Sequence, residues 1–169
     1  MSWELITTST QASSASTLEA NFTNIPFTDV AFFAVVFNGQ GGTIGQGSNC
    51  RIGLINTPDT SSNYDMESFV ISGGASAGVA YHQETNTDRW LVDNSNLGSY
   101  SSAIMYIGSD FHNNDKPLCF MKLSSETSSC QMSGWLDVQL ASLGNVTWGA
   151  EAGNIIANSY LSVYKVLSS

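Results

Sequence analysis

Residues 29–37, DVAFFAVVF, determine the fold class. The run is apolar at nearly every position after Asp29 and stops at Asn38. An uninterrupted apolar stretch of this length, bounded by turn-forming residues, predicts a central strand that is covered on both sides. Its β-branched and aromatic side chains favour a strand over a short helix.

The preceding stretch, residues 16–24, follows a different pattern. In STLEANFTN, apolar residues alternate with polar ones, so that Leu18, Ala20 and Phe22 would share one face. A period of two predicts a half-buried strand. Further strands are predicted around Trp3–Thr8, Cys50–Ile55, Tyr64–Ile71, Val79–Gln83, Arg89–Val92, Ser101–Ile107, Leu118–Leu123, Trp135–Leu140, Val146–Ala150 and Tyr160–Leu167.

Turn-forming segments rich in Gly, Asn, Asp and Ser separate these short strands. Many short strands with frequent turns are typical of sandwiches and barrels. The sequence therefore predicts an all-β chain folded as a single-domain antiparallel β-sandwich, jelly-roll-like, over residues 1–169. No repeat of fixed period argues for a propeller or a solenoid.

Charge and composition disfavour several partners. Only 11% of the 169 residues are charged, and 14 acidic against 5 basic residues give a net charge of −9. An acidic chain with scattered basic residues repels phosphate backbones and anionic membranes, so no nucleic acid and no membrane partner is expected. The start, MSWELITTST, has no signal-peptide pattern. We therefore expect synthesis and assembly in a cytoplasm.

The three cysteines, Cys50, Cys119 and Cys130, are expected to be small buried thiols. An odd number without a secretion signal argues against a disulfide framework. A bridge between Cys119 and Cys130 across a hairpin is the alternative.

No catalytic motif stands out. His82 and His112 lie thirty residues apart and in no metal-binding pair. Asp65 and Glu67 are two apart and would share a strand face, as the carboxylates of a glycosidase can, but no second pair accompanies them. A solvated strand face is the preferred interpretation. The sequence thus predicts no enzyme, no cofactor and no metal site.

Aromatic side chains offer the strongest binding potential. Exposed Trp and Tyr rings could stack on sugars or anchor a protein interface. The candidates for such contacts are Trp3, Trp90, Trp135, Trp148 and Tyr81. Most of the aromatic residues are expected to be core, and the sequence does not indicate which are exposed.

Both ends of the chain resemble a domain common among structural proteins of tailed bacteriophages. The matching pieces are SWELITTSTQASSAS, NFTNIPFTDVAFFAVVFNG and GNIIANSYLSVYKV. They cover roughly the first forty and last twenty residues. The chain departs from the pattern at Lys165, where the family usually has Gly after its terminal-strand Tyr. Members serve as tail-fibre modules and as small virion surface proteins, and the resemblance implies one of these roles.

The leading hypothesis is a bacteriophage virion structural protein, most specifically a capsid decoration or cement protein. It would bind neighbouring virion proteins, the major capsid protein or tail proteins, through strand faces and edges, and is expected to be a homotrimer. One alternative is a tail-fibre or receptor-binding module that contacts host surface glycans. The other is a carbohydrate-binding module or a glycan-active enzyme.

Overall fold

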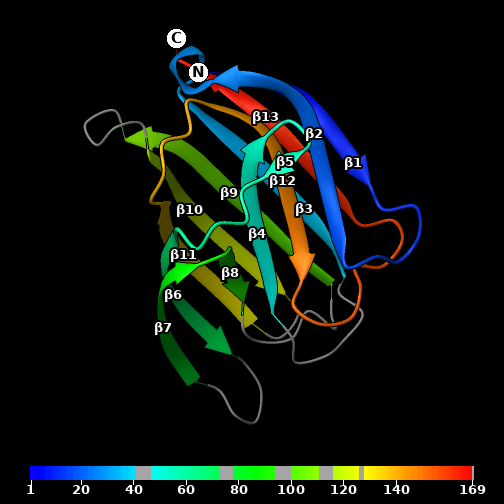
Figure 1. Cartoon of the computed structure of the whole chain (residues 1–169). Coiled ribbons are helices and arrows are strands. Elements are labelled where there is room, and N and C mark those ends of the chain that lie inside the picture. Colours follow the sequence, from blue (N-terminus) through cyan, green and yellow to red (C-terminus); the bar gives the residue numbers. More distant parts are fainter. Residues whose placement is uncertain (41–46, 73–77, 94–99, 111–115, 126–127, 169) are drawn as a thin grey trace.

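The computed structural model describes residues 1–40, 47–72, 78–93, 100–110, 116–125 and 128–168. These residues fold into two layers of antiparallel strands (Figure 1). The elements are β1 (Ser2–Thr10), β2 (Thr17–Pro26), the 3-10 turn η1 (Phe27–Asp29), β3 (Phe32–Gln40), β4 (Ser48–Leu54), β5 (Thr57–Pro58), β6 (Tyr64–Ser72), β7 (Gly78–Thr87), β8 (Trp90–Asp93), β9 (Tyr100–Asp110), β10 (Lys116–Ser125), β11 (Ser128–Leu136), β12 (Ser142–Ala150) and β13 (Tyr160–Leu167).

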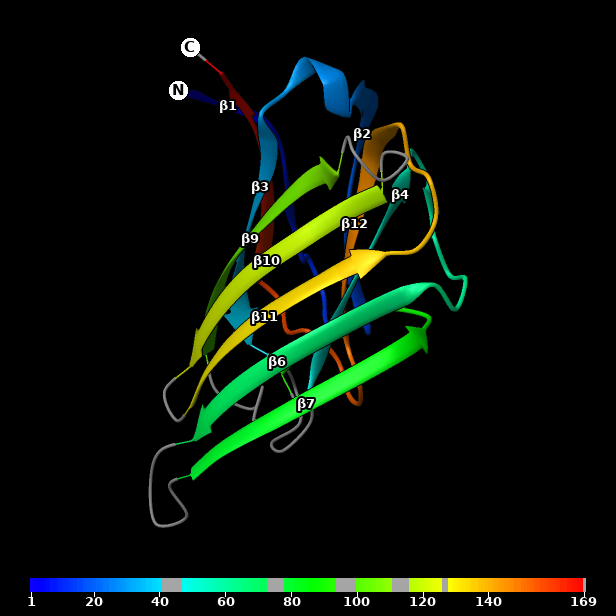
Figure 2. The same ribbon diagram turned by 90° about the vertical axis from the view of Figure 1, so that its left-hand side faces the viewer.

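The larger layer is an eight-stranded sheet in the order β1-β13-β3-β9-β10-β11-β6-β7. Figure 2 shows its strands side by side from β9 to β7. The two chain ends pair with each other, since Trp3 lies opposite Val166 and Leu5 opposite Tyr164. The terminal segments that carry the bacteriophage resemblance therefore form one edge of this sheet together with β3.

The smaller layer is a five-stranded sheet with β2, β12, β4 and β5 in order and β8 paired to β4. All strand pairs in both layers are antiparallel among the described residues. The predicted all-β, antiparallel, jelly-roll-like sandwich is confirmed. Its two layers come from strands far apart in sequence, because consecutive strands such as β1 and β2 fall in different sheets.

The core lies between the layers and is built by alternation. Phe33, Val35 and Phe37 of β3 are fully buried on the inner side. Phe37 stacks on Trp148 of the smaller sheet, with ring centroids 4.6 Å apart and planes 5° from parallel. Burying side chains of this size supplies the main driving force for folding, about 1.5–3 kcal/mol each. Phe37 and Trp148 thus join the two sheets directly.

A second connection between the layers is polar. The hydroxyl of Tyr64, at the start of β6 in the larger sheet, accepts a hydrogen bond from the backbone N–H of Ile52 in the smaller sheet. The same hydroxyl faces the carbonyl oxygens of Ile52 and Asp59, each at 3.1 Å, as a donor. The Ile52 carbonyl oxygen also accepts the backbone N–H of Asp59 at 2.9 Å. Tyr64 is fully buried, so the Ile52 N–H depends on the hydroxyl in place of water.

Two sequence-based expectations need correction. The strand predicted at Trp135–Leu140 lies instead at Ser128–Leu136, and its residues alternate between buried and more exposed. Small residues such as Ser128 and Gly134 occupy inward positions there, so hydrophobicity alone missed the strand. The strand of residues 29–37 is also not covered on both sides. Phe32 and Val36 on its outer face are only half-buried, since no second layer of the described strands packs on that side.

All three cysteines are free and buried, as predicted. Cys119 lies opposite Gly134, whereas Cys130 lies opposite Leu123, so the pair does not face across the hairpin of β10 and β11. Burial raises the pKa of the Cys50 and Cys119 thiols far above the ordinary value. Both therefore remain protonated at neutral pH and are poor nucleophiles.

The described segments contain no helix that is long and apolar enough to span a bilayer.

Candidate functional site

The outer side of the eight-stranded sheet carries rows of large apolar side chains. Strand register places Leu5, Tyr164, Tyr106 and Phe120 in one row across the sheet. Because paired residues of adjacent antiparallel strands point to the same side, these side chains share the outer face. We call this surface the aromatic face. Its apolar members are Trp3, Leu5, Phe32, Phe69, Ile71, Val79, Tyr81, Tyr106, Leu118, Phe120, Trp135 and Tyr164.

The side chains of the aromatic face are supported by one another. At one end, the ring of Trp3 meets those of Phe32, Tyr106 and Tyr164 at centroid distances of 6.0–6.4 Å. Near the other end, Phe69 and Tyr81 pack at 5.1 Å. Yet Phe69, Phe120 and Tyr81 each remain about half exposed. Contiguous apolar surface of this kind marks binding sites in soluble proteins.

The five aromatic residues predicted to make contacts divide between the core and this face. Trp3, Trp135 and Tyr81 are exposed on the aromatic face at 48%, 41% and 51%. Trp90 and Trp148 are fully buried, and the prediction was wrong for these two. Both pack between the layers, Trp148 against Phe37 and Trp90 edge-on against Tyr64, so neither ring can reach a ligand. The contact role of the other three stays a prediction.

A small pocket of about 160 Å³ opens in the middle of the aromatic face. The rings of Phe69 and Phe120 line it together with Gln131, Ser133 and Glu67. The Glu67 carboxylate accepts hydrogen bonds of 3.3 Å from the hydroxyls of Ser133 and of Tyr81. A held carboxylate beside apolar rings can accept further hydrogen bonds from a hydroxylated ligand while the rings contact its carbon atoms.

The opposite surface, the outer side of the smaller sheet, is polar. Asn145 is fully buried there and donates to Asn21, and its own amide oxygen accepts a bond from Thr147. Asn21 also accepts from the backbone N–H of Asn56. These side chains satisfy one another, so this face differs in character from the aromatic face.

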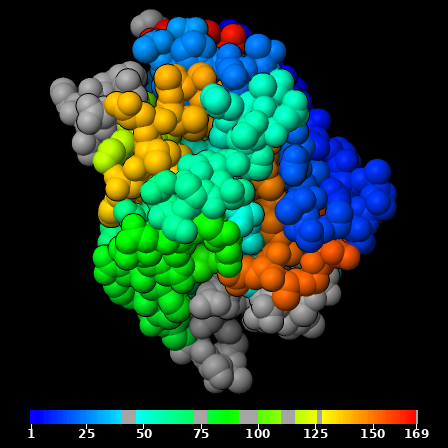
Figure 3. Space-filling model, viewed as in Figure 1, coloured from blue at the N-terminus to red at the C-terminus, as the bar shows by residue number. Residues whose placement is uncertain are grey.

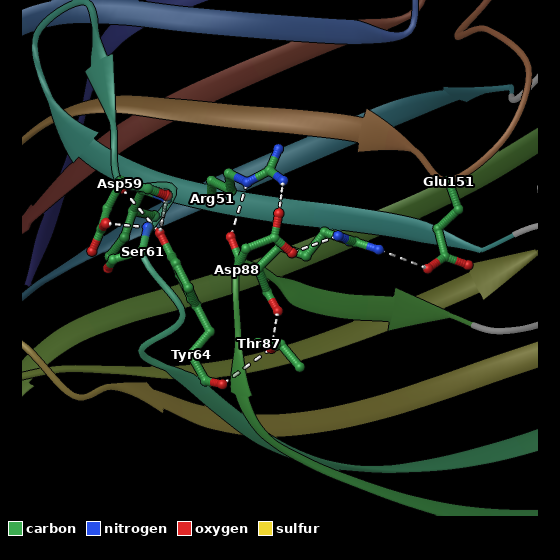
Figure 4. Close-up of polar contacts among 9 residues, drawn as sticks. Arg51, Asp59, Ser61, Tyr64, Thr87, Asp88 and Glu151 are labelled. Carbon is green, nitrogen blue, oxygen red and sulfur yellow. Dashed lines mark hydrogen bonds and ion pairs between the residues drawn. The ribbon is translucent and has the colours of Figure 1, made fainter.

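At one end of the polar face, four charged side chains alternate in sign (Figure 4). Arg51 donates from Nε to the carbonyl oxygen of Asp88, and its terminal nitrogen lies 2.5 Å from the Asp88 carboxylate. Arg89 pairs with the other oxygen of Asp88, also at 2.5 Å, and lies 3.7 Å from Glu151. This cluster ties β4, the β7–β8 connection and the end of β12 together.

The two neighbouring arginines stabilise the ionised form of Asp88. Burial works to raise its pKa, but the hydrogen bond and positive charge of Arg51, with Arg89 beside it, outweigh burial. The pKa of Asp88 therefore lies below its ordinary value of 3.8. The carboxylate stays charged throughout the neutral range and holds the two guanidinium groups together.

Beside this cluster lies a pocket of about 260 Å³ that we call the Asn49 pocket. It is lined by Ser16, Thr17, Asn49, Arg51, Arg89, Gly149, Ala150 and Glu151. In Figure 3, the start of β2 (blue), the green segment that includes Arg89 and the end of β12 (orange) lie on the same side of the molecule. No pattern in the sequence predicts this site, because its residues come from the start of β2, from β4, from the β7–β8 connection and from the end of β12.

The structure does not bring the other candidate catalytic or metal-binding residues together into a site among the described residues. Asp65 accepts a hydrogen bond from the backbone N–H of Asn86, whereas Glu67 contacts Tyr81 and Ser133, so the two carboxylates have different partners. His82 lies on β7, and His112 falls outside the described residues. Within the described ranges, no three His, Cys, Asp or Glu side chains cluster as metal ligands would.

Phe69, Phe120 and Leu118 were missed as candidates, although the sequence held a signal for two of them. In residues 116–125, KPLCFMKLSS, apolar residues fill both alternating sets. Cys119, Met121 and Leu123 point into the core. Leu118 and Phe120 therefore had to lie on the other side, where only a second layer or a partner could cover them.

Comparison with known proteins gives a fold likeness only. No family model matches the chain, and no curated protein does. Among solved structures, an alginate lyase from Aplysia kurodai is 8% identical at a TM-score of 0.39, covering 98% of this chain and 100% of its own. A legume lectin-like domain from Entamoeba histolytica is 10% identical at 0.34, covering 98% and 84%. The VP2 capsid protein of infectious bursal disease virus is 9% identical at 0.18, covering 99% and 42%.

These likenesses correct the prediction that the chain is not an enzyme. Three of the matching structures are alginate lyases, so β-sandwiches of this general form include enzymes, and the lack of a familiar motif was no ground for excluding catalysis. At such identities no residue role is transferred in either direction. The similarity to bacteriophage virion proteins is supported by none of these matches and stays a prediction.

Proposed function

We propose that this chain is a surface protein of a bacteriophage particle, of the capsid decoration or cement type, that attaches to a neighbouring virion protein through its aromatic face. The aromatic face is the observation that carries the proposal. It presents exposed Leu5, Phe69, Phe120 and Trp135 from strands that span the sheet. Aliphatic and aromatic side chains of this size are what the centres of protein interfaces use.

The contrast between the two faces supports attachment through the aromatic face. The polar face of the smaller sheet is covered with mutually bonded amides and hydroxyls, such as those of Asn21, Asn145 and Thr147. A particle surface protein needs one face that prefers a partner to water and another that tolerates water. The resemblance of both chain ends to bacteriophage virion proteins gives the partner class, and we propose assembly in the host cytoplasm, as a homotrimer.

The proposal is tested by incorporation into particles. Phe69→Ser combined with Phe120→Ser should lower the copy number in purified particles by at least tenfold, because both rings would lose their burial against the partner. Glu19→Gln on the polar face is the matched control and should incorporate normally. Thermal unfolding of each purified variant separates lost contact from lost folding.

Unchanged incorporation of the folded double variant would refute the contact surface. A wild-type count of only a few copies per particle would refute the decoration role while leaving a role in the tail. Sedimentation equilibrium of the free chain tests the homotrimer separately.

A second candidate function is contact with host glycans as part of a tail fibre. It is favoured by the pocket of about 160 Å³ on the aromatic face, which Glu67 lines. The Glu67 carboxylate is held by Ser133 and Tyr81, and the rings of Phe69 and Phe120 line the same pocket. Sugars are bound by this combination of acceptor and apolar ring. On a glycan array, Glu67→Gln should abolish any binding seen with the wild type, whereas Asp29→Asn, which does not line the pocket, should not. No glycan bound by the wild type would eliminate this candidate.

A further inference from the structure

The Asn49 pocket has features of a ligand site that is separate from the aromatic face. The side chain of Asn49 lies on the outer side of β4 and is only 7% exposed. Its amide makes no hydrogen bond with another described residue. Neither its amide oxygen nor its amide nitrogen is among the fully buried unpaired atoms of the described residues, so both atoms still reach the pocket that Asn49 lines. The amide therefore has capacity for a ligand.

Gly149 makes room for this amide. A Cβ at position 149 would lie 2.6 Å from the Asn49 side-chain oxygen and 3.2 Å from its nitrogen, both closer than atoms can approach comfortably. Asn49 is the neighbour of Gly149 across the β4–β12 pair. The absent side chain on β12 leaves the space next to Gly149 that the Asn49 amide occupies.

A second polar atom of the pocket is also unsatisfied. Nε of Arg89 is buried and has no hydrogen-bond partner among the described residues. The terminal nitrogens of Arg89 are held by Asp88 and, more loosely, by Glu151 at 3.7 Å. At that separation the Glu151 carboxylate keeps lone pairs free for other donors.

The charge of the pocket limits the ligand class. Arg51 and Arg89 are balanced by Asp88 and Glu151, so the formal sum is zero in a chain whose net charge is −9. Glu151 and the negative net charge of the chain would repel an anion, while the two guanidinium groups would repel a cation. A neutral ligand rich in hydroxyls avoids both repulsions. Each of its hydroxyls can also donate and accept hydrogen bonds.

We propose that the Asn49 pocket binds one neutral sugar ring. In this arrangement the Glu151 carboxylate accepts hydrogen bonds from adjacent hydroxyls, and the Asn49 amide donates to and accepts from others, with Thr17 at the rim. The volume of about 260 Å³ lies just below the range of roughly 300–1,000 Å³ typical of small-molecule sites, so the pocket suits one ring rather than a chain. The inference is independent of the contact surface and the partner proposed above.

The test is a titration of the isotope-labelled full chain by two-dimensional NMR. The probes are methyl α-glucoside, methyl β-galactoside and methyl α-mannoside, with glucuronate as the acidic comparison. At least one neutral glycoside should saturate and shift the backbone signals of Asn49, Arg51 and Glu151 while leaving those of Phe120 unchanged. Asn49→Ala and Glu151→Gln should each weaken that binding about tenfold.

Glu19→Gln, on the same face but outside the pocket, is the control and should bind as the wild type does. Well-dispersed spectra show which variants are folded, and Glu151, at the rim, is the safer substitution. If no neutral glycoside shifts these signals, the proposal is wrong. Tighter binding of glucuronate in Glu151→Gln, with no neutral glycoside bound, would also overturn it, because the site would then select an anion.

Discussion

Tyr64→Phe removes a single oxygen atom from the boundary between the two sheets. In the wild type, that oxygen accepts the N–H of Ile52 at 3.1 Å and donates toward the carbonyl oxygens of Ile52 and Asp59. Phenylalanine keeps the ring contact with Trp90, whose centroid lies 5.1 Å away, so packing is nearly unchanged. The substitution isolates the polar connection.

The expected cost follows from what is left behind. Tyr64 is fully buried, so no water replaces the hydroxyl, and the Ile52 N–H loses its acceptor. An unsatisfied buried donor costs about 1–3 kcal/mol, and we expect that loss in the free energy of unfolding. For a chain of this size, each kcal/mol lowers the midpoint of thermal unfolding by roughly 2–4 °C.

Equilibrium urea unfolding, followed by tryptophan fluorescence, measures the difference. Tyr160→Phe is the matched control, because its hydroxyl only accepts a long bond of 3.4 Å from Asn38 at a partly exposed position. We expect the control to change stability by less than about 0.5 kcal/mol. A cost for Tyr64→Phe no larger than that of the control would show that the hydroxyl does not join the sheets.

Further predictions concern space, titration and thiol access. Gly53→Ala should destabilise the fold by about 1–3 kcal/mol in the same urea assay, because its Cβ would lie 2.2 Å from the Thr57 carbonyl oxygen. Gly108→Ala is the control, because a Cβ there has open space around it, and it should change the free energy of unfolding by less than about 0.5 kcal/mol. Because the pKa of Asp88 is lower folded than its ordinary 3.8, its contribution is complete above about pH 4 and is lost as the pH falls below that. Asp88→Asn should therefore lose less stability than the wild type does between pH 5 and pH 2.5, and an equal loss would contradict the ion pair. A thiol reagent should label none of the cysteines until urea unfolds the chain, and fast labelling of the native protein would contradict their burial.

The fold class was predictable because strand patterning is local. The alternation of Leu18, Ala20 and Phe22 sets the inner face of β2, and all three are buried as the pattern requires. The strand at Ser128–Leu136 was not found, because its inward positions include Ser128 and Gly134, whose burial depends on neighbouring strands rather than on their own hydrophobicity. Local sequence does not carry that information.

The candidate sites were harder to predict for the same reason. Whether a Trp is core or surface depends on which face of which sheet it occupies, and nothing near Trp148 or Trp135 in sequence distinguishes the buried ring from the exposed one. The Asn49 pocket joins residues from the start of β2, from β4, from the β7–β8 connection and from the end of β12, so its existence follows only from the way the strands are arranged. A strand that is apolar on both faces was the available clue to the aromatic face.

Covalent footprinting of the aromatic face, on the free chain and in purified particles, tests the proposed contact most directly. Radical labelling reports side-chain exposure at Trp3, Tyr81, Phe120 and Trp135, all at least 41% exposed in the free chain. The proposed attachment predicts that labelling of these four residues drops severalfold in the particle. Labelling of Ile55, an exposed residue between β4 and β5 of the smaller sheet, should persist. Equal labelling of the four in both states, with protection confined to the smaller sheet, would contradict the account.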